Sequence, residues 1–495
     1  MHWVKKYSLW LLIIICNCIA ARAQVNNVPQ YQLDYAAISA DTPNRSSDSL
    51  TSPITDSVVR VRNIYFEGNK ITRDIILLRE LPFKKGDSIL VKNIPELFAR
   101  ALTQLRNTAL FSVTDLSIAI VKIEEPDIDI KIQVKERWYL WVLPHLKPTD
   151  RNLNQWLFEK GASTGRLDYG IKLMYDNVSG NRDKLRFYFI TGYTKQLRLS
   201  YYRPFIDKDL KWGIKTDISV GKNHEINYAT AQNKQLFLKE PDDYTRNFFE
   251  SKVEFTYRPA LYTTHSFGFG YTSQKVTDTI LKLNPDYLFN NAKSVRYPQI
   301  YYRLSYENLD YIPYPTKGYA AELEVGKSGI NNKMNLWFLN VKGLGSWHLT
   351  PTTFYSVSAL GSIKAPFKQP FYNTKMLGYN DFFLRGYEYY VVDGVAGGVV
   401  NATLATRLTN FSLNLPILKK YTSRLIPLKI YGKVYGNAGY VYNPQPGSNS
   451  LTNRMLLGGG FGFDILTDYD FTLKIDFSFN QLGENGLYLQ KKTLF

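Results

Sequence analysis

The 495-residue chain carries a formal charge of +18, from 61 basic and 43 acidic residues, and it is rich in aromatic side chains, with 37 Tyr, 28 Phe and 8 Trp. The basic residues are dispersed along the chain, which argues against a nucleic-acid-binding protein; a basic lumen or contact with anionic lipid headgroups accounts better for the charge. The two cysteines, Cys16 and Cys18, lie in the N-terminal export signal described next, so disulfides and thiolate metal sites are excluded from the chain beyond it.

The N-terminus is typical of an export signal. Lys5 and Lys6 precede an apolar run over residues 9–20 that is broken only by Asn17, and residues 21–23 read Ala-Arg-Ala, a small-residue cleavage site. Because the run is too short to cross about 30 Å of hydrocarbon comfortably, a membrane anchor is disfavoured. We therefore predict a signal peptide over 1–23. Residues 24–57 are polar with little periodicity and are predicted to form a flexible leader.

Residues 58–137 are predicted to form a small α+β domain. Within 91–110 the apolar residues recur at helical spacing, which indicates a strong amphipathic helix. The other expected elements are a helix over 71–81 and strands over 58–66, 113–122 and 128–138. The predicted order, β-α-α-β-β, is enough for one sheet with two helices.

From Trp138 onward the hydrophobic pattern has a period of two. In residues 473–480 the apolar side chains Leu, Ile, Phe and Phe alternate with Lys, Asp, Ser and Asn, so one face of the strand is apolar and the other polar. No stretch approaches eighteen consecutive apolar residues, which disfavours transmembrane helices. We therefore predict an all-β, antiparallel transmembrane β-barrel over 138–495, apolar outside and polar inside. Sixteen candidate strands begin near residues 138, 167, 184, 196, 211, 248, 266, 295, 319, 336, 354, 399, 429, 454, 471 and 486.

Three connections between these strands are long, at 222–245, 277–293 and 365–397. They are expected to be extracellular or folded inward, whereas the short turns are expected to face the periplasm. Counted among all the connections on the expected extracellular side, the third long connection is the sixth loop, between the eleventh and twelfth strands. It contains residues 384–390, Leu-Arg-Gly-Tyr-Glu-Tyr-Tyr, an unusual combination for the loop of a passive barrel.

This arrangement resembles the BamA/TamA-type outer-membrane assembly and translocation superfamily. The small domain is similar to the POTRA (polypeptide-transport-associated) module of that superfamily, and the Arg-Gly-Tyr tip occupies the expected loop. Four local patterns agree with the resemblance in order and spacing: the turns at 177–180 (Asn-Val-Ser-Gly) and 315–318 (Pro-Thr-Lys-Gly), the strand motif at 435–439 and the glycine-rich strand at 458–464. The similarity covers residues 58–495.

The resemblance implies a role for the tip of the sixth loop. In the family the loop arginine enters the lumen and pairs with an acid on the inner wall, which assigns that role to Arg385, with Gly386 and Tyr387 shaping the tip. A guanidinium can hold a loop by a bidentate, charge-assisted contact, and glycine allows a close backbone approach. The family's aspartate position falls on Asn437, so Asp464 or Asp476 is the candidate for the missing carboxylate.

The resemblance also implies a lateral seam between the first and last strands, where the family is thought to open for substrate strands. Pro144 lies in the expected first strand and is compatible with an edge, since proline cannot donate to a β-ladder. A position just past the end of that strand is the alternative for Pro144. The last strand, ending at Phe495, would form the other side of the seam.

The predicted function is the assembly or insertion of outer-membrane proteins, or the translocation of polypeptides, in the outer membrane of a Gram-negative bacterium with the POTRA-like domain in the periplasm. The expected partners are outer-membrane lipids, unfolded outer-membrane or surface polypeptides and accessory periplasmic or lipoprotein subunits, with no nucleic acid. A passive porin is the alternative. We expect no enzyme, cofactor or metal site, because the histidines lack metal-ligand spacing and His224 beside Glu225 is the only candidate pair.

Overall fold

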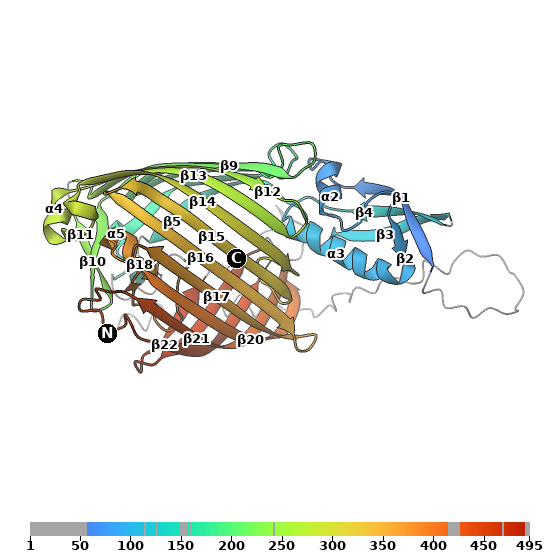
Figure 1. Cartoon of the computed structure of the whole chain (residues 1–495). Coiled ribbons are helices and arrows are strands. Elements are labelled where there is room, and N and C mark those ends of the chain that lie inside the picture. Colours follow the sequence, from blue (N-terminus) through green and yellow to red (C-terminus); the bar gives the residue numbers. More distant parts are fainter. Residues whose placement is uncertain are drawn as a thin grey trace, which may run out of the picture.

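The computed structural model describes residues 57–112, 115–124, 126–148, 156–157, 161–240, 243–379, 381–413, 426–467 and 470–490. The predicted signal peptide, nearly all of the leader and Phe495 lie outside these residues. The described chain forms a small α+β domain at one end of a large, curled β-sheet (Figure 1). No helix in the described part of the chain is long and apolar enough to cross a membrane.

The small domain is a four-stranded sheet packed against two helices. Its elements are β1 (Val58–Glu67), α2 (Asp74–Glu80), β2 (Ser88–Leu90), η3 (Val91–Asn93), α3 (Ile94–Asn107), β3 (Ser117–Glu124) and β4 (Asp127–Gln133). The strand order is β2-β1-β4-β3, with β1 parallel to β4. Phe98 and Leu105 of α3 share one buried core with Ile130 of β4, because both elements turn their apolar faces to each other. The sequence pattern did not predict β2, which is only three residues long and too short to show alternation.

The large sheet contains sixteen strands in a single antiparallel order. They are β5 (Leu140–Pro148), β6 (Leu167–Asp176), β7 (Lys184–Gly192), β8 (Thr194–Arg203), β9 (Trp212–Asn223), β12 (Arg246–Tyr257), β13 (Thr263–Val276), β14 (Ser294–Leu309), β15 (Gly318–Asn331), β16 (Met334–His348), β17 (Thr353–Ala365), β20 (Ala396–Leu413), β21 (Ile426–Tyr442), β22 (Leu456–Leu466), β23 (Thr472–Asn480) and β24 (Asn485–Gln490). Each strand pairs with its neighbours along the chain. The predicted count of sixteen strands is therefore confirmed.

The two faces of the large sheet differ as the alternation requires. On β22, Phe461 and Phe463 are about half exposed on the convex face, whereas Asp464 is buried on the concave face. On β23, Asp476 is likewise buried and faces inward. Pro144 lies inside β5, directly opposite Ile171 of β6, so a position past the strand end is wrong.

The long connections lie at the end of the sheet away from the small domain (Figure 1). They contain regular structure that the sequence pattern did not predict: the hairpin β10 (Glu225–Ala231) and β11 (Lys234–Lys239), α4 (Asp278–Leu283), η7 (Phe289–Asn291), α5 (Phe371–Thr374), β18 (Lys375–Leu377) and β19 (Val392–Asp393). The connection between β5 and β6 adds η6 (Thr164–Arg166). Ile226, Ile280 and Tyr287 from two of these connections share a buried apolar cluster. The connections therefore pack on one another as an ordered cap.

Candidate functional site

The connection between β17 and β20 folds into the concave side of the sheet. Gly386 accepts a hydrogen bond at its carbonyl from Asn480 Nδ2 (2.7 Å), and Tyr387, which is 1% exposed, donates its hydroxyl to the Leu457 carbonyl (3.1 Å). Gly386 has a φ of +89°, and a Cβ at this position would lie 2.7 Å from the Phe479 carbonyl oxygen. A glycine is needed here because the backbone is both left-handed and pressed against a strand.

The Arg385 side chain lies against β21 and β23. Its guanidinium carbon is 4.2 Å from the Tyr435 ring centroid, a cation–π contact, and its Nε is 4.0 Å from Asp476 Oδ2. Asn437 on β21 donates Nδ2 to the Arg385 carbonyl oxygen (3.0 Å) and so holds the backbone of the tip. Among the described residues, Arg385 Nη1 is buried without a hydrogen-bond partner, so the contact with Asp476 is a charge pair and not a bidentate bond.

A buried lysine separates the two candidate carboxylates. Lys433 Nζ lies 2.6 Å from Asp476 Oδ1 and 2.5 Å from Asp464 Oδ1, and its side chain is 1% exposed. Asp464 also accepts a hydrogen bond from the Tyr314 hydroxyl (3.0 Å), which comes from the turn between β14 and β15. Arg385, Asp476, Lys433 and Asp464 thus alternate in charge in a site with little access to water, and Lys474, the register partner of Asp464 on β23, adds a further cation beside them.

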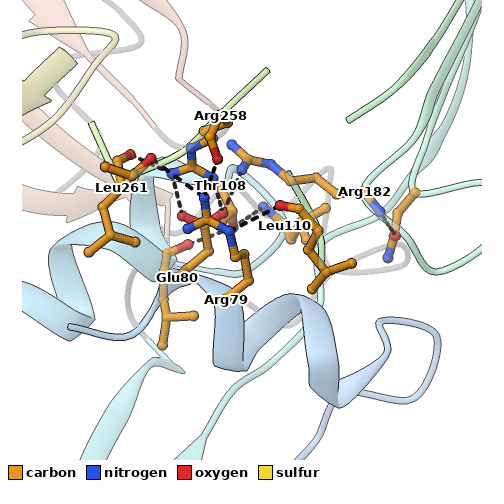
Figure 2. Close-up of polar contacts among 11 residues, drawn as sticks. Arg79, Glu80, Thr108, Leu110, Arg182, Arg258 and Leu261 are labelled. Carbon is orange, nitrogen blue, oxygen red and sulfur yellow. Dashed lines mark hydrogen bonds and ion pairs between the residues drawn. The ribbon is translucent and has the colours of Figure 1, made fainter. Parts of the chain in front are cut away.

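The small domain is joined to the large sheet through a second buried charge cluster. Glu80 lies at the end of α2 and is 1% exposed. Its carboxylate accepts hydrogen bonds from Nη1 and Nη2 of Arg258 (2.5 and 2.9 Å) and from Nη1 of Arg182 (3.1 Å). Arg258 follows β12 and Arg182 precedes β7, so both stand in turns at the same end of the sheet. Figure 2 shows the Glu80 carboxylate facing these two guanidinium groups. Arg79 adds hydrogen bonds to the carbonyls of Leu210 and Arg258 (3.2 and 2.9 Å).

Two forces oppose each other at Glu80. Burial by itself raises the pKa of the carboxyl group, but the charge and hydrogen bonds of Arg258, together with the charge of Arg182, outweigh it and hold the pKa below its usual value. Glu80 therefore stays ionised in the docked domain, where it compensates both arginines.

Further turns complete the domain contact. Arg137 Nη1 donates to Asp470 Oδ2 (2.6 Å) in the turn after β22, and Asn107 Nδ2 donates to the carbonyl of Leu309 (2.8 Å), the last residue of β14. In the turn after β6, Gly180 has a φ of +77°, and a Cβ there would be 2.3 Å from the Ile71 carbonyl oxygen. The glycine of the Asn-Val-Ser-Gly turn is thus required by the approach of the small domain.

Comparison with known protein families identifies the large sheet. A family model described as the Omp85 superfamily domain matches residues 177–481. The chain belongs to the Omp85 superfamily. A second model, for the POTRA family and described as a surface antigen variable number repeat, matches residues 59–137. The family expected from the sequence is confirmed, as is the fold class, a sixteen-stranded antiparallel sheet preceded by a small α+β POTRA domain.

Solved structures share the fold of this Omp85 protein at low sequence identity. BamA from Haemophilus ducreyi lacking POTRA domains 1–3 matches with a TM-score of 0.50 and 15% identity, over 88% of this chain and 83% of that one. CdiB from Escherichia coli matches with a TM-score of 0.51 and 10% identity, over 88% and 74%. No curated protein matches the sequence.

The structure of this Omp85 chain also contains site residues that sequence reasoning missed. Lys433 lies four residues before Asn437 on the same inward face of β21, so strand alternation could have placed it in the lumen. Glu80 gave no such signal, because no residue pattern in the sequence distinguishes it from Asp74, the other acid of α2. His224 and Glu225 contact different groups: Glu225 binds Arg166 (2.8 Å), and His224 Nδ1 contacts the Asp243 carbonyl (2.9 Å). In the described ranges, no group of three or more His, Cys, Asp or Glu side chains could hold a metal ion.

Proposed function

We propose that this Omp85 protein inserts outer-membrane proteins or moves polypeptides across the outer membrane, with its POTRA domain in the periplasm. Clients are captured at the POTRA domain and leave through a lateral seam between β5 and β24. The observation that carries this proposal is the pair of strand edges at the two ends of the sixteen-stranded order. Within the described residues, β5 pairs only with β6, and β24 pairs only with β23.

Both strands at the proposed seam are suited to transient pairing. Within the described residues, β24 spans six residues and β5 spans nine, whereas β20 spans eighteen, so the described parts of the two seam strands offer few backbone hydrogen-bonding groups to each other. Pro144 in the middle of β5 removes one more donor. An unpaired strand edge is a template for adding another strand, and a client β-strand is the partner that such an edge would take.

The POTRA sheet offers an edge for the earlier capture step. β3 pairs only with β4 among the described strands, and it exposes Val121 and Ile123 to 53% and 52%. A polypeptide can add to such an edge through main-chain hydrogen bonds that do not depend on its sequence. Apolar side chains beside that edge would favour unfolded, hydrophobic clients.

Disulfide locking tests the seam. Cysteine pairs joining Val142 to Leu487 or Leu489, all exposed on the convex face, are introduced into the full chain, and client delivery is followed in cells depleted of the wild-type protein. The matched control joins Leu173 to Phe187, which are register partners on β6 and β7. We expect the oxidised seam pair to stop client delivery, reductant to restore it and the control pair to have no effect. Undiminished delivery by a fully cross-linked seam refutes the proposal.

Conductance of the purified protein separates this function from that of a passive porin. The inward loop held at Arg385 should keep the lumen from conducting as a large, steady pore. A large, steady conductance that is unchanged by Arg385→Ala would support the porin and contradict the proposal.

A further inference from the structure

A row of exposed cations crosses the convex face at the end away from the POTRA domain. Lys195 on β8 stands directly opposite Lys222 on β9, and Lys222 stands opposite Asn247 on β12. The row continues from Asn247 to its register partner Lys275 on β13 and to Arg296 on the neighbouring β14. All four cations are exposed. The row therefore runs continuously over five adjacent strands.

Strand alternation shows that these side chains point outward. Lys195 shares its face of β8 with the exposed Leu197 and Leu199, and Lys222 shares its face of β9 with Ile218 and Val220. The same parity holds for the other members, since Lys275 shares its face of β13 with the exposed Tyr271 and Arg296 shares its face of β14 with the exposed Ile300. The cations thus stand at the rim of the apolar band that would face lipid.

The outward cations differ from the inward ones in their partners. On the same strands, inward Arg198 pairs with Asp217, and inward Arg303 pairs with Glu324. Among the residues that the structure describes, no ion pair forms to Lys195, Lys222, Lys275 or Arg296. Asp278, in the connection after β13, lies within Coulombic range of Lys275, whereas Lys195 and Lys222 form no ion pair among the described residues, so these two charges are available to an external anion.

The pairing of Lys195 with Lys222 is costly without such an anion. Like charges directly opposite each other destabilise an antiparallel pair. Both ammonium groups also converge on one ring, with Nζ of Lys195 and of Lys222 at 5.4 and 5.3 Å from the Tyr244 centroid. A cation–π contact favours each lysine but does not remove their mutual repulsion. An anion placed between the two ammonium groups would do so.

Outward cations near this end lie on one side of the described sheet, where the row extends one strand further to Lys327 on β15, whose Nζ lies 5.0 Å from the Trp337 ring centroid. The corresponding outward positions near this end of β17, β20, β21, β22 and β23 are uncharged, as at Ala365, Gly398, Tyr440, Leu457 and Phe479. Lysines that merely extend their charges toward water, as at any membrane surface, would be expected around the whole rim. A one-sided row indicates a specific binding surface.

We propose that this basic row binds the phosphate groups of glycolipids in the outer leaflet. The inference rests on the proposed orientation, with the POTRA domain in the periplasm, because that orientation puts the row at the outer surface. Lysine binds phosphate as a compact point charge, and the apolar band immediately beside it would contact the acyl chains of the same lipid. The lipid would thereby anchor β8 to β14 while the seam strands β5 and β24 remain free of it.

The test measures lipid binding by the full chain in detergent. The probes are lipid A carrying its phosphates, the same lipid A after dephosphorylation and inorganic phosphate, each followed by quenching of tryptophan fluorescence. We expect the phosphorylated lipid to bind more tightly than the dephosphorylated one. Lys195→Gln with Lys222→Gln should weaken that binding roughly thirtyfold, at about fivefold per lysine.

Two further variants keep the result interpretable. Lys252→Gln removes an exposed inward lysine on β12 and should leave lipid binding unchanged. Lys195→Arg with Lys222→Arg keeps both charges and should restore binding even if the glutamine variant folds poorly. Equal affinity for the two lipids, an unchanged affinity in the folded glutamine variant, or competition by inorganic phosphate at equal concentration would overturn the proposal. None of these outcomes depends on client delivery, so failure here leaves the seam proposal standing.

Discussion

Loss of the Glu80 carboxylate should release the POTRA domain from the large sheet. Glu80 is 1% exposed and is the acid between Arg258 and Arg182, whose side chains are 16% and 22% exposed. Replacing one partner of a buried ion pair costs about 3–5 kcal/mol, because it leaves charge buried without compensation. The partial exposure of both arginines places Glu80→Ala near the lower limit, about 3 kcal/mol, which shifts the docking equilibrium roughly 150-fold.

Electron–electron resonance distances measure this release directly. The residues that the structure describes contain no cysteine, which allows spin labels at Arg100 on α3 and at Leu349 in the turn after β16, both exposed. We expect one narrow distance in the wild type and a broad distribution in Glu80→Ala. Glu67→Gln, which removes an exposed acid paired with Lys131 on the same domain, is the matched control and should keep the narrow distance. Exchanging the charges, as Glu80→Arg with Arg258→Glu, should partly restore it.

A narrow distance in Glu80→Ala that equals the wild-type distance would refute this reasoning. It would mean that the other contacts, such as Arg137 with Asp470, hold the domain without the buried acid.

Three more predictions follow from the same contacts. Asp476→Asn should destabilise the protein by about 3–5 kcal/mol, and more than Arg385→Ala does, because Asp476 compensates both Arg385 and Lys433. Heat-modifiability on gels measures both losses, and equal losses would contradict the prediction. Gly386→Ala should cost about 1–3 kcal/mol from its positive φ and speed proteolysis of the loop, whereas unchanged cleavage would count against the anchoring geometry. Because the pKa of Glu80 is depressed, docking of the POTRA domain should be at full strength above the usual glutamate pKa of 4.5 and should weaken as the pH falls below that value. The same spin-label distances measure this, and distances that do not change with pH down to acid unfolding would contradict it.

Strand alternation in the sequence is sufficient to predict the architecture of the large sheet. A period of two is a local property of the chain, and each of the sixteen strands carries it separately, so their number and order could be predicted. Turn residues such as Gly180 could be recognised for the same reason, although the need for glycine there came from the neighbouring domain.

The sequence also placed Asn437, Asp464 and Asp476 on inward faces, but it left open which acid meets Arg385. Only the tertiary structure decided this, because the depth of the loop and the register between β21, β22 and β23 bring Asp476 to the guanidinium and put Lys433 between the two carboxylates. The Glu80 cluster could not be predicted from the sequence, since Arg182 and Arg258 both lie more than a hundred residues from Glu80 along the chain. Alternation assigns a side chain to a face of a sheet; distances between faces, loops and domains arise only when the whole chain has packed.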